Sequence, residues 1–114
     1  MSSKKSTKKI GPVEQVLTKA LEKIKKGWCR GATAVNKTGM SVSVNSKHAV
    51  RFCSMGSVMA STRNKDLVND ARCLLSEMTP GPFGIIQYND DMAKKPQILG
   101  VFKKAIKKAH EEGL

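Results

Sequence analysis

The sequence is poor in aromatic and in acidic residues. Only 4% of its 114 residues are aromatic, and 9 Asp+Glu stand against 21 Lys+Arg, which leaves a formal net charge of +12. A core with so few aromatic side chains must rest on aliphatic residues and on the six methionines. The positive surplus attracts anions over long range, so nucleic acid or another polyanion is the first partner class to consider. The simpler alternative is a charged surface that maintains solubility.

Cysteine is scarce, and long apolar runs are absent. Cys29, Cys53 and Cys73 are odd in number and form no Cys-x-x-Cys pair, which argues against a disulfide framework and against a zinc site. No apolar run approaches the length of a membrane span, and the Lys- and Ser-rich N-terminus lacks the apolar part of a secretory signal. We therefore expect a cytoplasmic protein with reduced thiols, no membrane segment, no metal and no other cofactor.

The composition changes once along the chain, near its N-terminus. Residues 11–114 are predicted to form a single globular domain, which at this size can bury a core without disulfides. Residues 1–10 contain nothing that can form a core. We predict that they are a flexible basic arm able to touch phosphate through Lys4, Lys5, Lys8 and Lys9.

Apolar residues recur at helical spacing in four segments. One helix is predicted from Pro12 to Gly27, a second from Asn45 to Ser61, a third from Asn64 to Thr79, and a last one beginning near Pro96. Trp28, directly after the first helix, is predicted to anchor the core rather than to bind a ligand, because large aromatic residues dominate small cores.

The segment from Asn45 to Ser61 carries the most distinctive pattern. In a helix, Gly56 would lie beside a face of small residues that lets another backbone approach closely, which would compensate its intrinsic cost of about 1 kcal/mol. We predict that this helix is the central packing element and that Cys53 lies in its middle. The residues sharing the small face would be Ala49, Cys53, Ser57 and Ala60.

Two shorter segments predict extended structure. Ala32–Val35 and Met40–Val44, joined by the turn residues Asn36–Gly39, predict a β-hairpin that packs on the helices. Phe83–Tyr88 is apolar and bounded by Gly and Pro, which predicts a strand or a buried extended segment, and the Asn-Asp-Asp sequence that follows predicts a turn or a helix cap. The expected fold class is therefore α+β, mainly helical, with about four helices around a small hairpin.

Several short blocks carry a resemblance to known proteins. They are Gly27-Trp28, Gly31-Ala32, Phe52-Cys53-Ser-Met-Gly56 and Tyr88-Asn89-Asp90. Together they resemble a domain of unknown function found in bacteriophages and actinobacteria, whose pattern is roughly Gly-Trp, Trp-Cys-x-x-Gly-Ala and Trp-Asn-Asp.

The resemblance covers residues 13–109, with three departures from that pattern. Phe52 and Tyr88 replace Trp, and Ser57 replaces Ala, which are mild changes that leave the packing interpretation intact. The resemblance implies a bacterial or phage setting, in the host cytoplasm if the chain is phage-encoded, and brings no catalytic residue.

A cysteine hydrolase is one catalytic hypothesis. Cys53 would be the nucleophile, His48 or His110 the base, and Asp90 the group that orients the base. A thiol in the middle of a helix gains no lowering of its pKa from the helix N-terminus, so a buried structural cysteine is the simpler interpretation. Asn89 and its acidic neighbours lack the spacing of a calcium loop, and an Asx turn or cap explains them.

The basic residues are the strongest functional signal. Ammonium groups on one face of the last helix, together with the N-terminal arm, favour phosphate contact without sequence specificity, although charged faces of amphipathic helices are often only solvated. We expect a non-enzymatic, small, basic, phage-type accessory protein that binds nucleic acid or another polyanion. The alternatives are a protein-binding modulator with an acidic host partner, and a small hydrolase using Cys53. The lysines predicted on the last helix are Lys103, Lys104, Lys107 and Lys108.

Overall fold

The computed structural model describes residues 10–114, and it confirms the mainly helical α+β class. The predicted contacts of Lys4, Lys5, Lys8 and Lys9 lie outside these residues. Helices α1 and α3 have the predicted bounds, and α5 begins beside Pro96 as expected. In chain order the elements are α1 (Pro12–Lys26), β1 (Ala34–Val35), β2 (Arg51–Phe52), α2 (Ser54–Ser61), α3 (Lys65–Met78), α4 (Ile85–Gln87), the π-helix η1 (Tyr88–Met92) and α5 (Lys95–Glu112).

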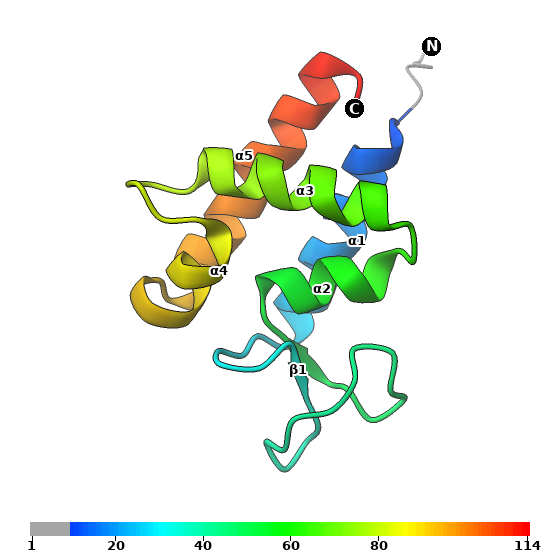
Figure 1. Ribbon diagram of the computed structural model, residues 1–114, viewed down its shortest axis with the longest axis vertical. Coiled ribbons are helices and arrows are strands. Elements are labelled where there is room, and N and C mark those ends of the chain that lie inside the picture. Colours follow the sequence, from blue (N-terminus) through cyan, green and yellow to red (C-terminus); the bar gives the residue numbers. More distant parts are fainter. Residues whose placement is uncertain (1–9) are drawn as a thin grey trace.

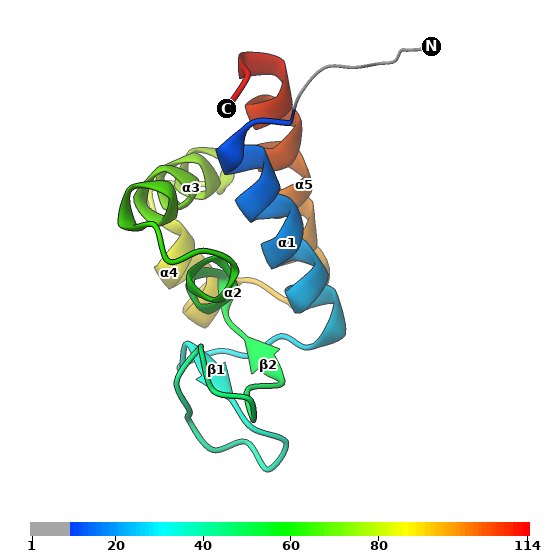
Figure 2. The same ribbon diagram turned by 90° about the vertical axis from the view of Figure 1, so that its right-hand side faces the viewer.

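The helices form two layers, with the small sheet at one end. Helices α1 and α5 run side by side, and α2, α3 and α4 stack against them on one side (Figure 2). The sheet and its loops lie below α2, at the end away from the chain's C-terminus (Figure 1). Leu17 and Ile24 of α1, Leu75 of α3 and Phe102 of α5 are fully buried between the layers, so the apolar stripes that predicted these helices meet in one core.

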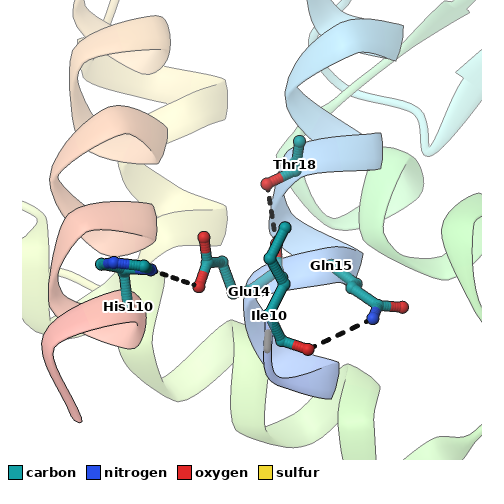
Figure 3. Close-up of polar contacts among 5 residues, drawn as sticks. All are labelled: Ile10, Glu14, Gln15, Thr18 and His110. Atoms are coloured by element: carbon teal, nitrogen blue, oxygen red, sulfur yellow. Dashed lines mark hydrogen bonds and ion pairs between the residues drawn. The ribbon is translucent and has the colours of Figure 1, made fainter. Parts of the chain in front are cut away.

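The end opposite the sheet is closed by contacts between α1 and α5. The carbonyl oxygen of Leu114 accepts hydrogen bonds from the N–H groups of Val13 and Glu14 at 3.0 and 3.2 Å. The Glu14 carboxylate also lies 3.0 Å from Nδ1 of His110 across the two helices (Figure 3). The first N–H donors of α1 are thus satisfied by the carbonyl oxygen of Leu114, just beyond the end of α5.

The predicted central helix is shorter than expected. Helix α2 spans only Ser54–Ser61, whereas residues 45–50 form turns and bends and Arg51–Phe52 form β2. The N–H of Phe52 donates to the Gly27 carbonyl at 3.0 Å, which holds this stretch extended. The prediction of one small face from Ala49 to Ala60 is therefore wrong, and Cys53 is the N-cap of α2 rather than a mid-helix residue.

The predicted hairpin forms over a short stretch only, and a second segment also pairs with its first strand. Asn36 N–H donates to the Met40 carbonyl at 2.9 Å, as a tight turn requires. Beyond it, the N–H of Val42 donates to the Ala34 carbonyl at 3.0 Å and an isolated bridge joins Val35 and Ser41, so the predicted pairing is present but short. On its other side β1 pairs antiparallel with β2, which buries Phe52, whereas Met40 is 65% exposed.

The strand predicted at Phe83–Tyr88 is wrong, because this segment is helical. Ile85, Tyr88 and Asn89 are buried, whereas Ile86 is 54% exposed. That spacing of three and four residues is helical, and it was obscured by the short length of the apolar run. The Asn-Asp-Asp sequence accordingly lies in η1 and not in a simple turn.

Gly56 tests the close packing of α2. A Cβ atom at this position would lie 1.8 Å from the carbonyl oxygen of Thr33, so the predicted close backbone approach is confirmed. Gly56→Ala should lower the free energy of unfolding by about 1–3 kcal/mol or more, since backbone atoms would have to move. Urea denaturation measures the change.

Gly100→Ala is the matched control. Gly100 lies inside α5, and a Cβ there meets no atom within 4 Å. This variant should gain up to about 1 kcal/mol from helix propensity. Equal stability of Gly56→Ala and the wild type would contradict the packing described for α2.

Candidate nucleic-acid interface and the Asn89 network

Asn89 is a buried polar junction, with 1% of its surface exposed. Its carboxamide Oδ1 accepts three hydrogen bonds, from Trp28 Nε1 at 2.8 Å, from the N–H of Ser54 at 3.0 Å and from the hydroxyl of Ser54 at 2.7 Å. The bond from the Ser54 N–H satisfies the first donor of α2. Asn89 therefore caps a helix, as one prediction allowed, but the helix lies 35 residues earlier in the chain.

The amide nitrogen of Asn89 completes the network. Its Nδ2 donates to the Cys29 carbonyl at 3.3 Å and to Asp90 Oδ1 at 2.9 Å, and the same carboxylate oxygen accepts from the N–H of Gly31 at 3.1 Å. The loop after α1, the start of α2 and η1 are thus joined through one side chain. These segments contain Gly27-Trp28, Cys53-Ser54 and Asn89-Asp90, so the contacts bring these three blocks of the sequence together.

Cationic side chains gather around this network. The guanidinium of Arg30 lies 5.1 Å from the Trp28 ring centroid and donates to the Ala93 carbonyl, and Lys95 Nζ donates to the Lys25 carbonyl at 3.0 Å. The last turn of α1, the loop after it and the first turn of α5 therefore lie against one another. This arrangement brings together cationic residues from two segments that are 63 to 70 residues apart in the sequence.

The sequence from the last turn of α1 to the first residue of α3 contains a signal that our prediction of site residues missed. Residues 23–65 hold nine of the 21 Lys+Arg and none of the nine Asp+Glu. The fold places this run in the half of the molecule that bears the sheet, from the sheet and its loops up through α2 to the start of α3 (Figures 1 and 2). We call residues 23–65 with Lys94 and Lys95 the cationic end. The Lys and Arg of the run are Lys23, Lys25, Lys26, Arg30, Lys37, Lys47, Arg51, Arg63 and Lys65.

Few carboxylates approach the cationic end. Glu22 pairs with Lys25 at 3.2 Å, and Asp90 is held by Gly31 and by the Asn89 amide. Asp91, the next residue of η1, and Asp66, which directly follows Lys65, are exposed. The positive charges of the run therefore outnumber the carboxylates near them.

The four lysines predicted on the last helix all lie on α5, and one of them is neutralised. Lys108 forms ion pairs with Glu77 and with Glu112, and the hydrogen bond to Glu77 raises the pKa of the Lys108 ammonium. The other three, Lys103, Lys104 and Lys107, are exposed. A shallow hollow of about 320 Å³ brings Lys104, Lys107 and Lys108 together with Glu111 and Glu112, so this face is more nearly balanced in charge than the cationic end.

The residues of the hydrolase hypothesis are not brought together. His110 pairs with Glu14 at the opposite end of the molecule (Figure 3), and His48 lies exposed in a turn. The Sγ atom of Cys53 accepts a hydrogen bond from the N–H of Gly56 at 3.2 Å, yet burial raises the pKa of its thiol. A nucleophilic cysteine needs the opposite shift.

Cys29 and Cys53 each follow one residue of a short parallel bridge between Trp28 and Phe52. The N–H of Cys29 donates to the Phe52 carbonyl at 3.1 Å, which places the two cysteines next to each other. Burial, followed by the neighbouring Cys53 thiol, raises the pKa of Cys29 from 9.0 to about 11. Both thiols are therefore protonated near neutral pH.

Residues 10–114 contain neither a cluster of metal-binding side chains nor a membrane-spanning helix. In this part of the chain, no group of three or more His, Cys, Asp or Glu side chains is arranged to hold a metal ion. Within the same residues, no helix combines the length and the apolar character needed to cross a bilayer.

Comparison with known families gives one match, which extends over most of the chain. Residues 10–108 match a family described as a family of unknown function (DUF6197). The chain belongs to this family. No curated protein and no solved structure matches the chain. The expected membership in a family of unknown function is confirmed. The family description assigns no activity, so a function has to be inferred from the surface of the chain itself.

Asn89 provides a direct test of the network. Asn89→Ala would leave the Trp28 indole and the Ser54 hydroxyl and N–H without their acceptor inside the fold. Since each buried unsatisfied group costs about 1–3 kcal/mol, we expect the free energy of unfolding to fall by about 3 kcal/mol or more. Denaturant titration followed by Trp28 fluorescence measures it.

Asn69→Ala is the control for the loss of an asparagine side chain. Asn69 is exposed, and its Oδ1 accepts only from Arg72, at 2.6 Å, among the described residues. Its replacement should change stability by no more than about 0.5 kcal/mol. Similar losses for the two variants would refute a special role for Asn89.

Proposed function

We propose that the protein binds nucleic acid, or another polyanion, through its cationic end, as a non-enzymatic accessory protein. The observation that carries this proposal is the run of residues 23–65, which holds nine Lys+Arg and no Asp+Glu and lies in the half of the fold that bears the sheet. Such a concentration of positive charge attracts phosphate backbones and releases their counterions on binding.

The cationic end is a supported surface rather than a set of loose side chains. Lys95 is tied to the Lys25 carbonyl, and Arg30 stacks on the Trp28 ring and bonds to the Ala93 carbonyl. Lys94 occupies the N-cap of α5, where the positive end of the helix dipole adds to its charge. Arg30 and Lys95 are therefore held in place before a phosphate binds, which lowers the cost of ordering them.

The contacts would carry little sequence information. Helix α2 has only eight residues and no Lys or Arg of its own, and α1 and α5 contribute only a terminal turn each to this end, so no helix presents a long basic face to a major groove here. The cations lie on turns, helix ends and short strands, which suits contact with backbone phosphates. The exposed lysines of α5 and the N-terminal arm could extend the contact surface on longer ligands.

A phage-type origin and a cytoplasmic location belong to the same proposal. The origin is supported by the blocks around Gly27-Trp28, Phe52–Gly56 and Tyr88–Asp90, which resemble phage and actinobacterial proteins. The location is supported by three cysteines that are all free thiols in the described fold, as in a reducing compartment.

Binding to an acidic host protein is the second candidate function. A hollow of about 430 Å³ lies where the 44–45 loop meets α2 and α3. Val44, Met59 and Val68 form its apolar part, and Arg63 and Lys65 supply positive charge. An acidic segment with one or two apolar side chains would fit such a surface.

Salt-dependent binding to nucleic acid tests the proposal. Fluorescence anisotropy with labelled duplex DNA, single-stranded DNA and RNA of unrelated sequences should give similar affinities that fall with salt. For duplex DNA the log–log slope should be about −0.9 per phosphate neutralised. Lys26→Gln combined with Lys94→Gln should weaken binding on all sequences alike and make the slope shallower.

Lys103→Gln combined with Lys104→Gln is the matched control, because it removes the same charge from another exposed surface. This variant should have the smaller effect. A larger effect would place the interface on the last helix, and an absence of wild-type binding at low salt would exclude the nucleic-acid function.

A further inference from the structure

The cationic end contains a hollow that the proposed function does not by itself explain. It has a volume of about 500 Å³ and lies between the turn after β1 and the loop before β2. No carboxylate lines it. Its lining residues are Asn36, Lys37, Thr38, Lys47, His48 and Val50.

Both walls of the hollow are held by local hydrogen bonds. In the turn, Asn36 Oδ1 accepts from the N–H of Thr38 at 3.0 Å, from the Thr38 hydroxyl at 2.8 Å and from the N–H of Met40 at 3.0 Å. In the loop, Ser46 Oγ accepts from the N–H of His48 at 3.0 Å. The N–H of Val50 donates to the Val35 carbonyl at 2.9 Å, which ties the loop to β1.

The hollow presents donors but few acceptors. Lys37 and Lys47 supply one ammonium group each, and their backbone N–H groups have no acceptor within the described residues. The hydroxyl of Thr38 already donates to Asn36. Behind the turn, Arg51 Nη2 lies 4.0 Å from where a Cβ atom of Gly39 would stand, so a guanidinium adds to the positive potential.

We propose that this hollow is a phosphate-binding site that takes a phosphomonoester. The ligand would be the 5′-terminal phosphate of a nucleic acid or the phosphate of a small molecule, and the first source depends on the proposed function. A monoester carries nearly two negative charges at neutral pH, which the two ammonium groups match. Val50 is the only apolar residue in the lining and the His48 imidazole is its only ring, so the lining favours an anion over a stacked base.

A terminal phosphate fits the hollow better than an internal one. A phosphodiester carries a sugar on both sides and only one negative charge, whereas a terminal group can enter between two loops from one direction. The cationic end as a whole would then hold the strand, and the hollow would hold its end.

Two oligonucleotides of the same sequence distinguish these contributions, one with a 5′-phosphate and one with a 5′-hydroxyl, each labelled at its 3′ end. Wild type should bind the phosphorylated strand about fivefold more tightly, as expected for a few exposed charge-assisted contacts. Lys37→Gln combined with Lys47→Gln should abolish this preference. The control, Lys103→Gln combined with Lys104→Gln, should keep it.

Titration with inorganic phosphate provides the second arm, at constant ionic strength and with chloride as the reference. Saturable NMR shifts of the Lys37, Lys47 and His48 amides support the site, and a preference for the 5′-phosphate in addition identifies a strand end as the source. Saturable shifts without that preference support a small phosphate ligand. The absence of both the phosphate shifts and the 5′-phosphate preference would overturn the inference.

The two proposals can fail independently. Equal binding of both oligonucleotides without phosphate shifts leaves the nucleic-acid function standing and removes the site. Phosphate shifts without any oligonucleotide binding would support the phosphate site and exclude the nucleic-acid function. The amide spectrum of the Lys37 and Lys47 variant, compared with that of wild type, shows that the fold is retained.

Discussion

The carboxamide of Asn89 is the constraint on which the rest of this structure depends. A buried amide is unfavourable unless its polar atoms are bonded, and here one oxygen receives three donors from two distant segments. The π-turn of η1 makes this possible, since it buries both Tyr88 and Asn89. Loss of this side chain would release the loop after α1, the start of α2 and η1 together.

The same junction explains how a strongly charged end can be ordered. Like charges repel one another, so a surface rich in lysine and arginine needs support from elsewhere in the fold. Trp28 and Gly31 anchor the loop that carries Arg30, and Ser54 anchors α2 behind the sheet. The aliphatic core between α1 and α5 holds the helices, and the Asn89 network attaches the cationic end to them.

Much of the helical framework could be predicted from the sequence, because α1, α3 and α5 are long enough for their apolar spacing to be unambiguous. The errors occurred where contacts distant in sequence override local patterns. The Asn45–Ser61 segment has helical spacing. However, Phe52 pairs with Trp28 and with Ala34, and this pairing keeps the chain before α2 in an extended conformation. The Phe83–Tyr88 segment was too short to separate a helix from a strand.

The candidate site was predictable only in part. The positive charge and the lysine cluster of the last helix were predicted from the sequence, but residues 23–65, which contain no Asp or Glu, were not included in the predicted site. That run is visible in the sequence, whereas its collection at one end requires the fold. The role of Asn89 could not be inferred, because its partners Ser54 and Trp28 lie 35 and 61 residues away.

The most direct test of the central claim is an NMR map of the protein titrated with a short DNA duplex. Amides of the cationic end, residues 23–65 with Lys94 and Lys95, should shift with added DNA and return toward their free positions as salt is raised. Amides near Lys103 and Lys107 should shift less. Shifts confined to the second half of α5, or a spectrum unchanged by DNA at low salt, would contradict the account.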